Sequence, residues 1–153
     1  MAEVNANLES KQYIVVNLGN EHYGIDIKYI DNIVRMQNIT RVPKSQEYFK
    51  GVINLRGEVI PVMSLRLRFG LEADQYAKDT RILILKPESH GAIGIIVDSV
   101  KEVLTLDNDS IEKPSSKNAS DDKLVFLSGV GKNGDELISI LNILGVIEDK
   151  EDE

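Results

Sequence analysis

One stretch, from Phe49 to Gly70, constrains the fold of this chain more than any other, because it contains several consecutive elements: FKGVINLRGEVIPVMSLRLRFG. Residues 52–55 form a short apolar strand, and Arg56-Gly57 supplies a turn in which the glycine can take a positive φ. Residues 59–62 return as a second strand. Pro61 has no backbone N–H to donate to a neighbouring strand, so we expect this second strand at a sheet edge.

A short helix is expected directly after this hairpin. Ser64 stands where an N-cap residue would, Leu65 and Phe69 lie four residues apart on one helical face, and Gly70 suits a C-terminal stop. The pattern therefore predicts a strand, a turn, a second strand and one or two helical turns. A final helix is expected at Asn142–Ile147.

The rest of the chain is also rich in short strands separated by glycine turns. Residues 13–18 and 23–27 read as strands on either side of a Gly19-Asn20 turn. Many short strands with few helical stretches are typical of antiparallel barrels or a sandwich. The sequence therefore predicts a mainly β fold.

Apolar residues repeat their spacing seventy residues apart. The pattern Gly24-Ile25-x-Ile27-x-x-Ile30-x-x-Ile33 recurs as Gly94-Ile95-x-Val97-x-x-Val100-x-x-Val103. Gly51-Val52 with its following turn is echoed by Gly129-Val130 with Asn133-Gly134, and Asn-Gly between apolar runs is a strong hairpin signal. The match suggests a duplicated unit, although such patterns also recur by chance in β-rich chains.

Two small barrels are the domain organisation that we predict. A unit of about 70 residues has a small core, so two units are expected to associate or to exchange elements. We place one domain at 12–148, composed of a first barrel at 12–80 and a second at 81–148, between which elements can be exchanged. Residues 1–11 are expected to be flexible, Glu112–Lys123 to form a mobile loop, and 149–153 to form an acidic tail.

The first copy of the repeat has more apolar residues than a short helix can bury. Ile27, Ile30 and Val34 follow helical spacing, and Ile33 adds a fourth apolar side chain. The same excess recurs in the second copy at Val97, Val100 and Val103. Either some of these side chains lie on the surface and mark a partner site, or all of them belong to the core.

The targeting and redox features favour a cytoplasmic protein. The first eleven residues are polar and resemble no secretory signal, and the longest apolar runs are far shorter than the roughly 18 residues of a membrane span. We therefore expect no direct membrane insertion. The chain has no cysteine, which excludes disulfides, thiolate nucleophiles and zinc sites with sulfur ligands.

The charge distribution argues against nucleic-acid binding, which is the main alternative function for a small β-barrel. The net charge is −7, and residues 81–153 carry fifteen acids and eight bases, whereas residues 1–80 carry ten of each. A surface that binds a duplex normally has a basic excess, because neutralisation of phosphates dominates affinity. We therefore expect no nucleic-acid partner.

One phosphate-binding pattern occurs, at Gly129-Val130-Gly131-Lys132-Asn133-Gly134, which fits G-x-G-x-x-G. That motif needs a helix after its last glycine, whereas Glu136–Ile140 reads as a strand. A hairpin is the better interpretation, and a nucleotide-dependent enzyme is the weaker alternative. We find no convincing active site, and we predict a protein without catalytic residues, cofactor or metal.

Several segments in this order resemble the CheW family of chemotaxis coupling proteins, from about Gln12 to Glu148. They are Tyr23-Gly24-Ile25-Asp26-Ile27, Ile39-Thr40-Arg41-Val42-Pro43, Lys50-Gly51-Val52-Ile53-Asn54-Leu55-Arg56-Gly57, Ile60-Pro61-Val62, Leu65-Arg66-x-Arg68-Phe69-Gly70 and Gly94-Ile95-Ile96-Val97-Asp98-Ser99-Val100.

The resemblance implies two SH3-like five-stranded β-barrels that are packed about a shared core, with short helices and no enzymatic activity. It further implies that the chain is a scaffold in chemotaxis signal transduction, which is a two-component system. Such a scaffold contacts the regulatory domain of the histidine kinase CheA and the cytoplasmic tips of methyl-accepting chemoreceptors. The chain would be a monomer when isolated and would be recruited to membrane-associated receptor arrays. Matching positions assign receptor or coupling roles to Ile30, Asn32, Gly51, Arg56, Val97 and Val100.

The chain departs from the family pattern at two positions. Asn32 stands where a glutamate that pairs with the arginine at Arg56 is common, and Asp31 or Glu58 could replace that charge. An exposed ion pair contributes only about 0.2–1 kcal/mol, so the orientation of Arg56 should change more than stability does. Ser64 replaces an aspartate, and because serine caps helices about equally well we expect the short helix to persist.

Overall fold

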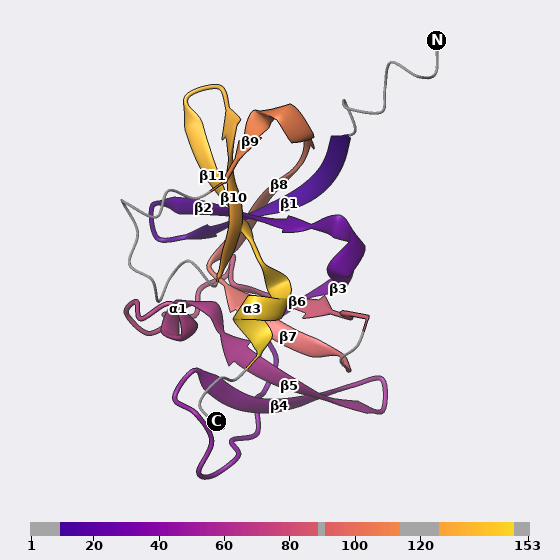
Figure 1. Ribbon diagram of the computed structural model, residues 1–153. Coiled ribbons are helices and arrows are strands. Elements are labelled where there is room, and N and C mark those ends of the chain that lie inside the picture. The colour runs from indigo at the N-terminus through magenta and orange to yellow at the C-terminus, as the bar shows by residue number, and fades with distance from the viewer. Residues whose placement is uncertain (1–9, 89–90, 114–125, 149–153) are drawn as a thin grey trace. The chain divides into compact units, whose positions relative to one another are not determined.

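The computed structural model describes residues 10–88, 91–113 and 126–148, and the mainly β prediction is confirmed (Figure 1). The strands are β1 (Ser10–Leu18), β2 (Glu21–Asp26), β3 (Ile30–Arg35), β4 (Phe49–Leu55), β5 (Glu58–Ser64), β6 (Arg81–Leu85), β7 (Ile93–Val97), β8 (Ser99–Asp107), β9 (Ile111–Glu112), β10 (Leu127–Asn133) and β11 (Glu136–Leu141). The helices are α1 (Leu65–Arg68), α3 (Ile143–Ile147) and the 3-10 turns η2 (Ile27–Tyr29) and η3 (Asn108–Ser110).

The strands form two sheets that have the same internal order. One sheet has five strands in the order β3-β6-β7-β5-β4, and the other has six in the order β8-β1-β2-β11-β10-β9. The sixth strand, β9, has only two residues, and a single bridge between Thr40 and Val52 occupies the equivalent place beside β4. The predicted five-stranded pattern therefore holds for one sheet and gains a short strand in the other.

The hairpin that dominates the sequence forms as predicted. β4 and β5 pair antiparallel and are joined by Arg56 and Gly57, whose φ values of 54° and 84° are both positive. Positive φ at both central residues is the signature of the type I′ turn, whose twist matches that of the flanking strands. The Asn54 side-chain oxygen accepts a hydrogen bond from the Gly57 N–H at 3.1 Å and supports the turn.

The cap and stop of α1 also form as predicted. Ser64 Oγ accepts a hydrogen bond from the Leu67 N–H at 3.1 Å, so serine caps this helix as expected. At the other end, the Gly70 N–H donates to Leu67 O at 3.1 Å and the Leu71 N–H donates to Arg66 O at 2.8 Å. With Gly70 at a φ of 77°, these bonds are those of a Schellman motif.

The prediction that Pro61 places its strand at a sheet edge is wrong, because β5 lies between β7 and β4. Val52, the residue opposite Pro61, uses both its N–H and its C=O to bond Thr40, so this pair exchanges no hydrogen bonds. The missing donor of Pro61 therefore faces β7, where the ladder begins only at Val62. An internal strand tolerates the proline because no hydrogen bond is due at that position.

The helix expected from the spacing of Ile27, Ile30 and Val34 is replaced by the three-residue turn η2 and strand β3. Along β3 half-buried residues alternate with exposed ones, which is the period of a strand. Pairing of β3 with the buried strand β6 explains why the strand prevails over the helical spacing.

The G-x-G-x-x-G segment lies in a hairpin, as the sequence favoured. β10 and β11 pair antiparallel, and no helix begins at Gly134, which sits in the turn with a φ of 64°. The final helix is confirmed as α3, and the Asn142 side chain caps it by accepting a hydrogen bond from the Gly145 N–H at 3.4 Å.

The internal repeat is visible in the strand pairing. Both hairpins carry a register shift at the same place, between Phe49 and Gly51 in β4 and between Leu127 and Gly129 in β10. Both second strands also make a parallel three-residue ladder opposite a glycine of the repeated pattern, with Val62 facing Gly94 and Ile140 facing Gly24. Shared strand order, bulge and ladder favour duplication over a chance match.

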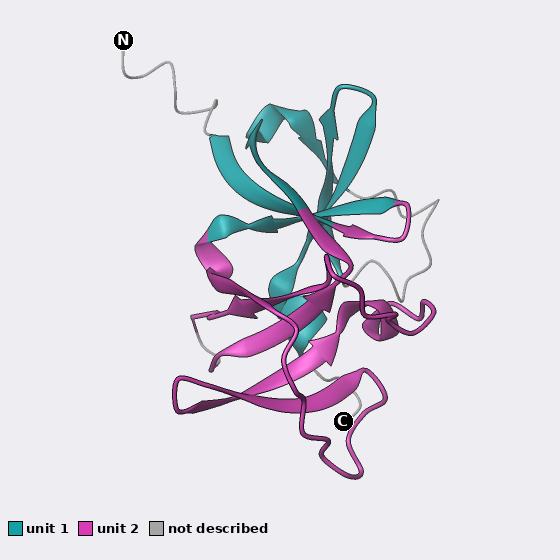
Figure 2. Cartoon of the chain, turned by 180° about the vertical axis from the view of Figure 1, so that it is seen from behind, with its two compact units in different colours: residues 1–16, 21–27, 101–153 teal, residues 17–20, 28–100 magenta. Residues whose placement is uncertain are grey.

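The chain divides into two compact units, which Figure 2 shows in different colours. Unit 1 comprises residues 1–16, 21–27 and 101–153, and unit 2 comprises residues 17–20 and 28–100. The buried core cluster of unit 1 contains Tyr13, Val15, Leu106, Ile138 and Ile140. That of unit 2 contains Ile53, Ile60, Val62, Ile82, Ile84 and Ile96.

The bounds of these units differ from the boundary between residues 80 and 81 that we predicted from the sequence. The difference arises from strand pairing, because β2 pairs with β11 and β7 pairs with β5, so each unit takes strands from both halves of the chain. Most of residues 1–11, most of the Glu112–Lys123 segment and all of 149–153 lie outside the described residues.

Candidate partner-binding surface

The six residues expected to contact partners all fall in unit 2, but on five different segments. Ile30 and Asn32 lie on β3, Gly51 on β4, and Arg56 in the β4–β5 turn. Val97 ends β7 and Val100 lies near the start of β8. Strands β3 and β4 stand at opposite ends of the five-stranded order, so no ladder pairs the strand of Asn32 with the hairpin of Arg56.

Two of the six side-chain positions are closed to direct contact. Val97 is fully buried, and Gly51 is buried under the backbone of Thr40. A Cβ added to Gly51 would lie 2.0 Å from Thr40 O, and its φ of 140° also disfavours a side chain. Gly51 therefore permits the close approach that lets Thr40 bond Val52, and any influence on a partner passes through packing.

Arg56 is the most accessible of the six. It is exposed at the tip of the β4–β5 hairpin and makes no ion pair with any residue that the structure describes. Exposed Val59 follows on the same hairpin, with 63% of its surface accessible. A cation beside an exposed apolar side chain can offer a partner both charge and contact area.

The side chain of Asn32 has one polar atom without a hydrogen-bond partner among the described residues. This atom, Oδ1, is buried. A buried acceptor left without a donor costs free energy, so this atom lowers stability in the part of the chain that the structure describes. Its neighbour Asp31 lies 3.9 Å from Lys86 Nζ, so that carboxylate already has a cation nearby.

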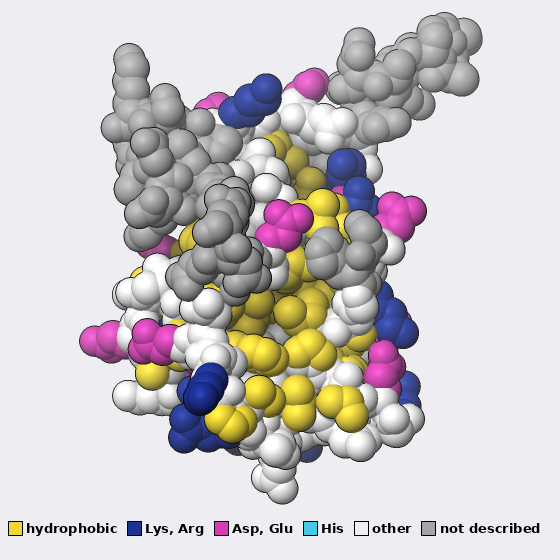
Figure 3. Space-filling model, turned by 60° about the horizontal axis from the view of Figure 1, so that its bottom comes forward, with side chains coloured by type: hydrophobic (Ala, Val, Ile, Leu, Met, Phe, Trp, Pro, Cys, Tyr) yellow, Lys and Arg dark blue, Asp and Glu magenta, His cyan; other side chains and the backbone are white. Residues whose placement is uncertain are grey.

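The repeated apolar pattern divides between core and surface. Val97 is buried, whereas Ile30, Val34 and Val100 are half-buried. The exposed members are Ile27 and Ile33, at 38% each, and Val103 at 53%. Figure 3 shows that hydrophobic side chains reach the surface, together with Lys and Arg side chains. The structure therefore supports the interpretation in which some of these side chains lie on the surface and others in the core.

A charged network at α1 was not predicted from the sequence. The Arg66 side chain donates from Nε to Asp98 Oδ1 at 2.8 Å and from Nη2 to Asp98 Oδ2 at 2.5 Å. The Gly19 N–H also donates to Asp98 Oδ2, at 2.8 Å. These bonds stabilise the ionised carboxylate and lower the pKa of Asp98, with the Arg66 hydrogen bonds as the main cause. The partners are 32 and 79 residues from Asp98, so no local pattern could have found the network.

A second carboxylate nearby has the opposite shift. Ser64 Oγ donates a hydrogen bond to Asp74 Oδ2 at 2.5 Å, while Asp74 Oδ1 is buried without a partner among the described residues. Burial raises the pKa of Asp74, and the bond from Ser64 only partly opposes this. Both carboxylates have structural partners, because Asp98 binds Arg66 and Asp74 accepts from the serine that caps α1.

Within residues 10–88, 91–113 and 126–148, no group of three or more His, Cys, Asp or Glu side chains is placed to hold a metal ion. Helices α1 and α3 have four and five residues, and no helix in these ranges is long and apolar enough to cross a membrane.

Comparison with known proteins gives a consistent family match. Residues 12–151 match the family model described as CheW-like domain. The chain is 36% identical to the chemotaxis protein CheW of Helicobacter pylori, over 93% of this chain and 84% of that protein. It is 33% identical to the Bacillus subtilis chemotaxis protein CheW, over 90% of this chain and 87% of that protein.

A solved structure matches as well. The crystal structure of scaffolding protein TtCheW from Thermoanaerobacter tengcongensis superposes with a TM-score of 0.84 and 36% sequence identity. The match covers 93% of this chain and 95% of that one. The likeness therefore extends through both sheets.

Proposed function

This chain belongs to the CheW-like domain family, and from that premise we propose that it is a non-enzymatic scaffold that couples chemoreceptors to a CheA-type histidine kinase in bacterial chemotaxis. The observation that carries the proposal is the match of nearly the whole chain to chemotaxis CheW proteins and to a structure described as a scaffolding protein. This likeness supports the chemotaxis role over the nucleic-acid alternative.

A scaffold of this kind acts by position. By binding kinase and receptor together, it raises the effective concentration of one near the other and fixes their relative geometry. The protein would work in the cytoplasm and would join membrane-associated arrays through the receptor. Partner binding therefore has to come from accessible side chains on rigid elements.

Within the proposed surface the six residues divide into two roles. Ile30, Asn32, Arg56 and Val100 are accessible enough to contact a partner, whereas the buried positions Gly51 and Val97 would act as positioning residues. Arg56 supplies an exposed cation that has no ion pair within the part of the chain that the structure describes. A carboxylate of a receptor or kinase could pair with it.

The first test is kinase stimulation. Phosphorylation of a CheA-type kinase in receptor-containing membranes is measured with and without the chain. We expect stimulation that requires both the receptor and this protein. Absence of stimulation, with both partners active alongside a known CheW protein, would contradict the proposed function.

The matched variant Arg56→Asn then tests the residue. Asparagine tolerates the positive φ of the type I′ turn better than alanine, so the guanidinium is removed while the hairpin is kept. We expect at least about a tenfold loss of stimulation, by the loss of one charge-assisted contact. The melting temperature should stay equal or rise. Lys132→Asn, on the other hairpin, is the control, and equal stimulation by both variants would contradict the role of Arg56.

A further inference from the structure

Two neighbouring hollows in unit 2 share a pair of cations. The first hollow is lined by the apolar or aromatic side chains of Met36, Ile39 and Tyr76 and by the polar side chains of Gln37, Asn38, Arg41 and Lys50. Arg41 and Lys50 also line the second hollow, together with Lys44, Glu47 and Phe49. The two cations therefore stand on the ridge between a mainly apolar hollow and a more polar one.

The cations of this region are not neutralised. Arg41, Lys44 and Lys50 form no ion pair with any residue in the described part of the chain. Glu47 is the only acidic side chain that lines either hollow. In a chain with a net charge of −7, three unpaired bases around two hollows make a local positive surface.

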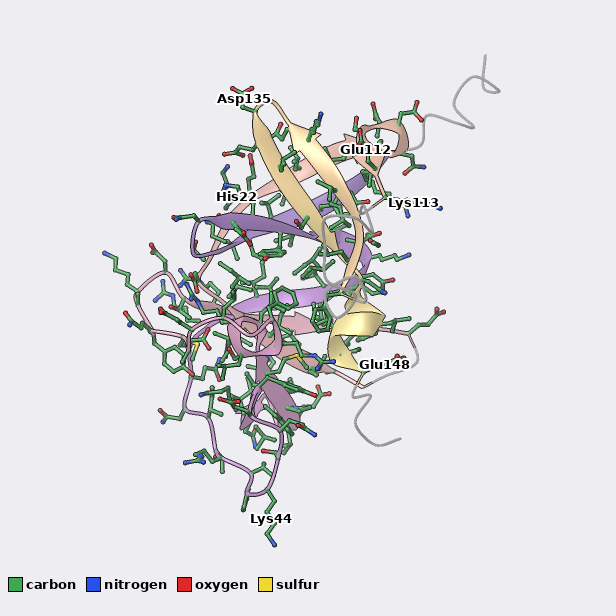
Figure 4. The ribbon with its side chains drawn as sticks, turned by 60° about the vertical axis from the view of Figure 1, so that its left-hand side comes forward. His22, Lys44, Glu112, Lys113, Asp135 and Glu148 are labelled. Carbon is green, nitrogen blue, oxygen red and sulfur yellow. The ribbon has the colours of Figure 1, made fainter. Side chains whose placement is uncertain are left out.

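Core packing and local hydrogen bonds hold the residues around the two hollows in place. Met36 and Ile39 pack against the buried core cluster of unit 2, which fixes the apolar floor. Local hydrogen bonds shape the loop above it, where Ser45 Oγ donates to Val42 O at 2.8 Å and the Phe49 N–H donates to Gln46 O at 3.0 Å. Lys44 takes a φ of 64° within this loop, and Figure 4 shows its side chain projecting away from the fold.

From this arrangement we propose that the 36–50 segment and Tyr76 form a docking site for a short acidic peptide segment that carries one large apolar residue. The apolar side chain enters the hollow between Met36, Ile39 and Tyr76. Flanking carboxylates pair with Arg41 and Lys50 and extend towards Lys44. Tyr76 is 51% exposed, so a bound side chain would cover apolar surface that now faces water.

Charge complementarity selects a peptide over a nucleic acid. A duplex carries a negative charge about every 1.7 Å along its axis. It would extend beyond the three cations onto the rest of a protein whose net charge is negative, and its phosphates would be repelled there. A short acidic segment ends within the patch and avoids that repulsion. The apolar hollow adds a requirement that a bare polyanion does not meet. The proposal is independent of kinase coupling.

The test uses three fluorescent peptides that bind the full chain. The first has four acidic residues around a central phenylalanine, the second replaces that phenylalanine with serine, and the third replaces the acids with lysine. Fluorescence anisotropy measures affinity at two salt concentrations, and amide chemical shifts locate the bound peptide. We expect only the first peptide to bind measurably, with weaker binding at high salt and shifts confined to residues 36–50 and around Tyr76.

Two charge-reversal variants complete the test. Arg41→Glu and Lys50→Glu should each weaken the acidic peptide at least about tenfold, whereas Lys132→Glu on β10 should have little effect. Tyr76→Ser should weaken it while leaving charge unchanged. Equal binding of the phenylalanine and serine peptides, equal loss in Lys132→Glu, or shifts outside the segment would each overturn the proposal.

Discussion

The Arg66–Asp98 pair illustrates how individual residues set the electrostatics of this protein. The two side chains are 19% and 30% exposed, and they make two hydrogen bonds in the fork geometry that arginine favours. The Asp98 N–H also donates to Asn17 O at 3.1 Å. The carboxylate therefore ties together α1, the β1–β2 turn and the end of β7 within unit 2.

The pair leads to a prediction about Asp98→Asn. The substitution should cost about 1–2 kcal/mol of unfolding free energy at neutral pH, a value reduced by partial solvent screening. Because the folded pKa of Asp98 lies below its ordinary value of 3.8, its stabilisation is present above that pH. It is lost as pH falls through the folded pKa. Chemical denaturation of both proteins across pH 2–7 is the measurement, with the pH limits chosen to span roughly the carboxyl range.

Asp74 provides a control, because its pKa is shifted in the opposite direction to that of Asp98. Its folded pKa lies above the ordinary value, chiefly because it is buried, so the folded state gains stability as pH falls through the folded pKa. Replacing Asp74 with asparagine should remove that gain. A stability difference for Asp98→Asn that stayed constant down to low pH would show that the residue acts by packing alone.

Among the elements, two parallel ladders are the least expected from local sequence. Gly24 of β2 faces Ile140 of β11, and Gly94 of β7 faces Val62 of β5. Because glycine has no side chain, large β-branched side chains can pack against the ladder at each of these positions. The repeated Gly-Ile pattern was visible in the sequence, but its reason becomes clear only where these strands meet.

The two glycines should respond differently to alanine. A Cβ at Gly94 would lie 2.8 Å from Ile82 Cγ2, a branch fixed close to its backbone. At Gly24 the nearest atom, at 3.0 Å, would be Ile140 Cδ1, the end of a movable side chain, and the fixed branch Ile138 Cγ2 would be farther away, at 3.2 Å. We expect Gly94→Ala to cost about 2–3 kcal/mol and Gly24→Ala about 1 kcal/mol or less. Equilibrium denaturation compares them, and equal costs would contradict the steric argument.

Considered as a whole, the molecule groups its strands by unit and not by position along the chain. Unit 1 joins strands from the first 27 residues to strands after residue 100, and unit 2 uses the segment between them. The two sheets nevertheless share one strand order. Reciprocal exchange of a hairpin between two copies of a duplicated unit accounts for both facts.

Hydrogen exchange should reveal this grouping. In Gly24→Ala, faster exchange is expected at Ile138–Ile140, the partner ladder, with Val62–Ser64 unchanged. In Gly94→Ala the pattern should reverse, with Val62–Ser64 exchanging faster. Exchange that instead followed the two halves of the sequence, before and after residue 80, would contradict the division into these units.

The sequence by itself determined the β4–β5 hairpin, its helix α1, the final helix α3 and the family. Turns and caps form between residues a few positions apart, so residues such as Gly57, Ser64 and Gly70 suffice to predict them. The tertiary structure alone decided that β3 is a strand, that Pro61 lies in an internal strand, and that Arg66 meets Asp98. It also decided which strands share a unit. An alternating apolar pattern shows that a strand has a buried face, but it does not encode which distant strand lies beside it.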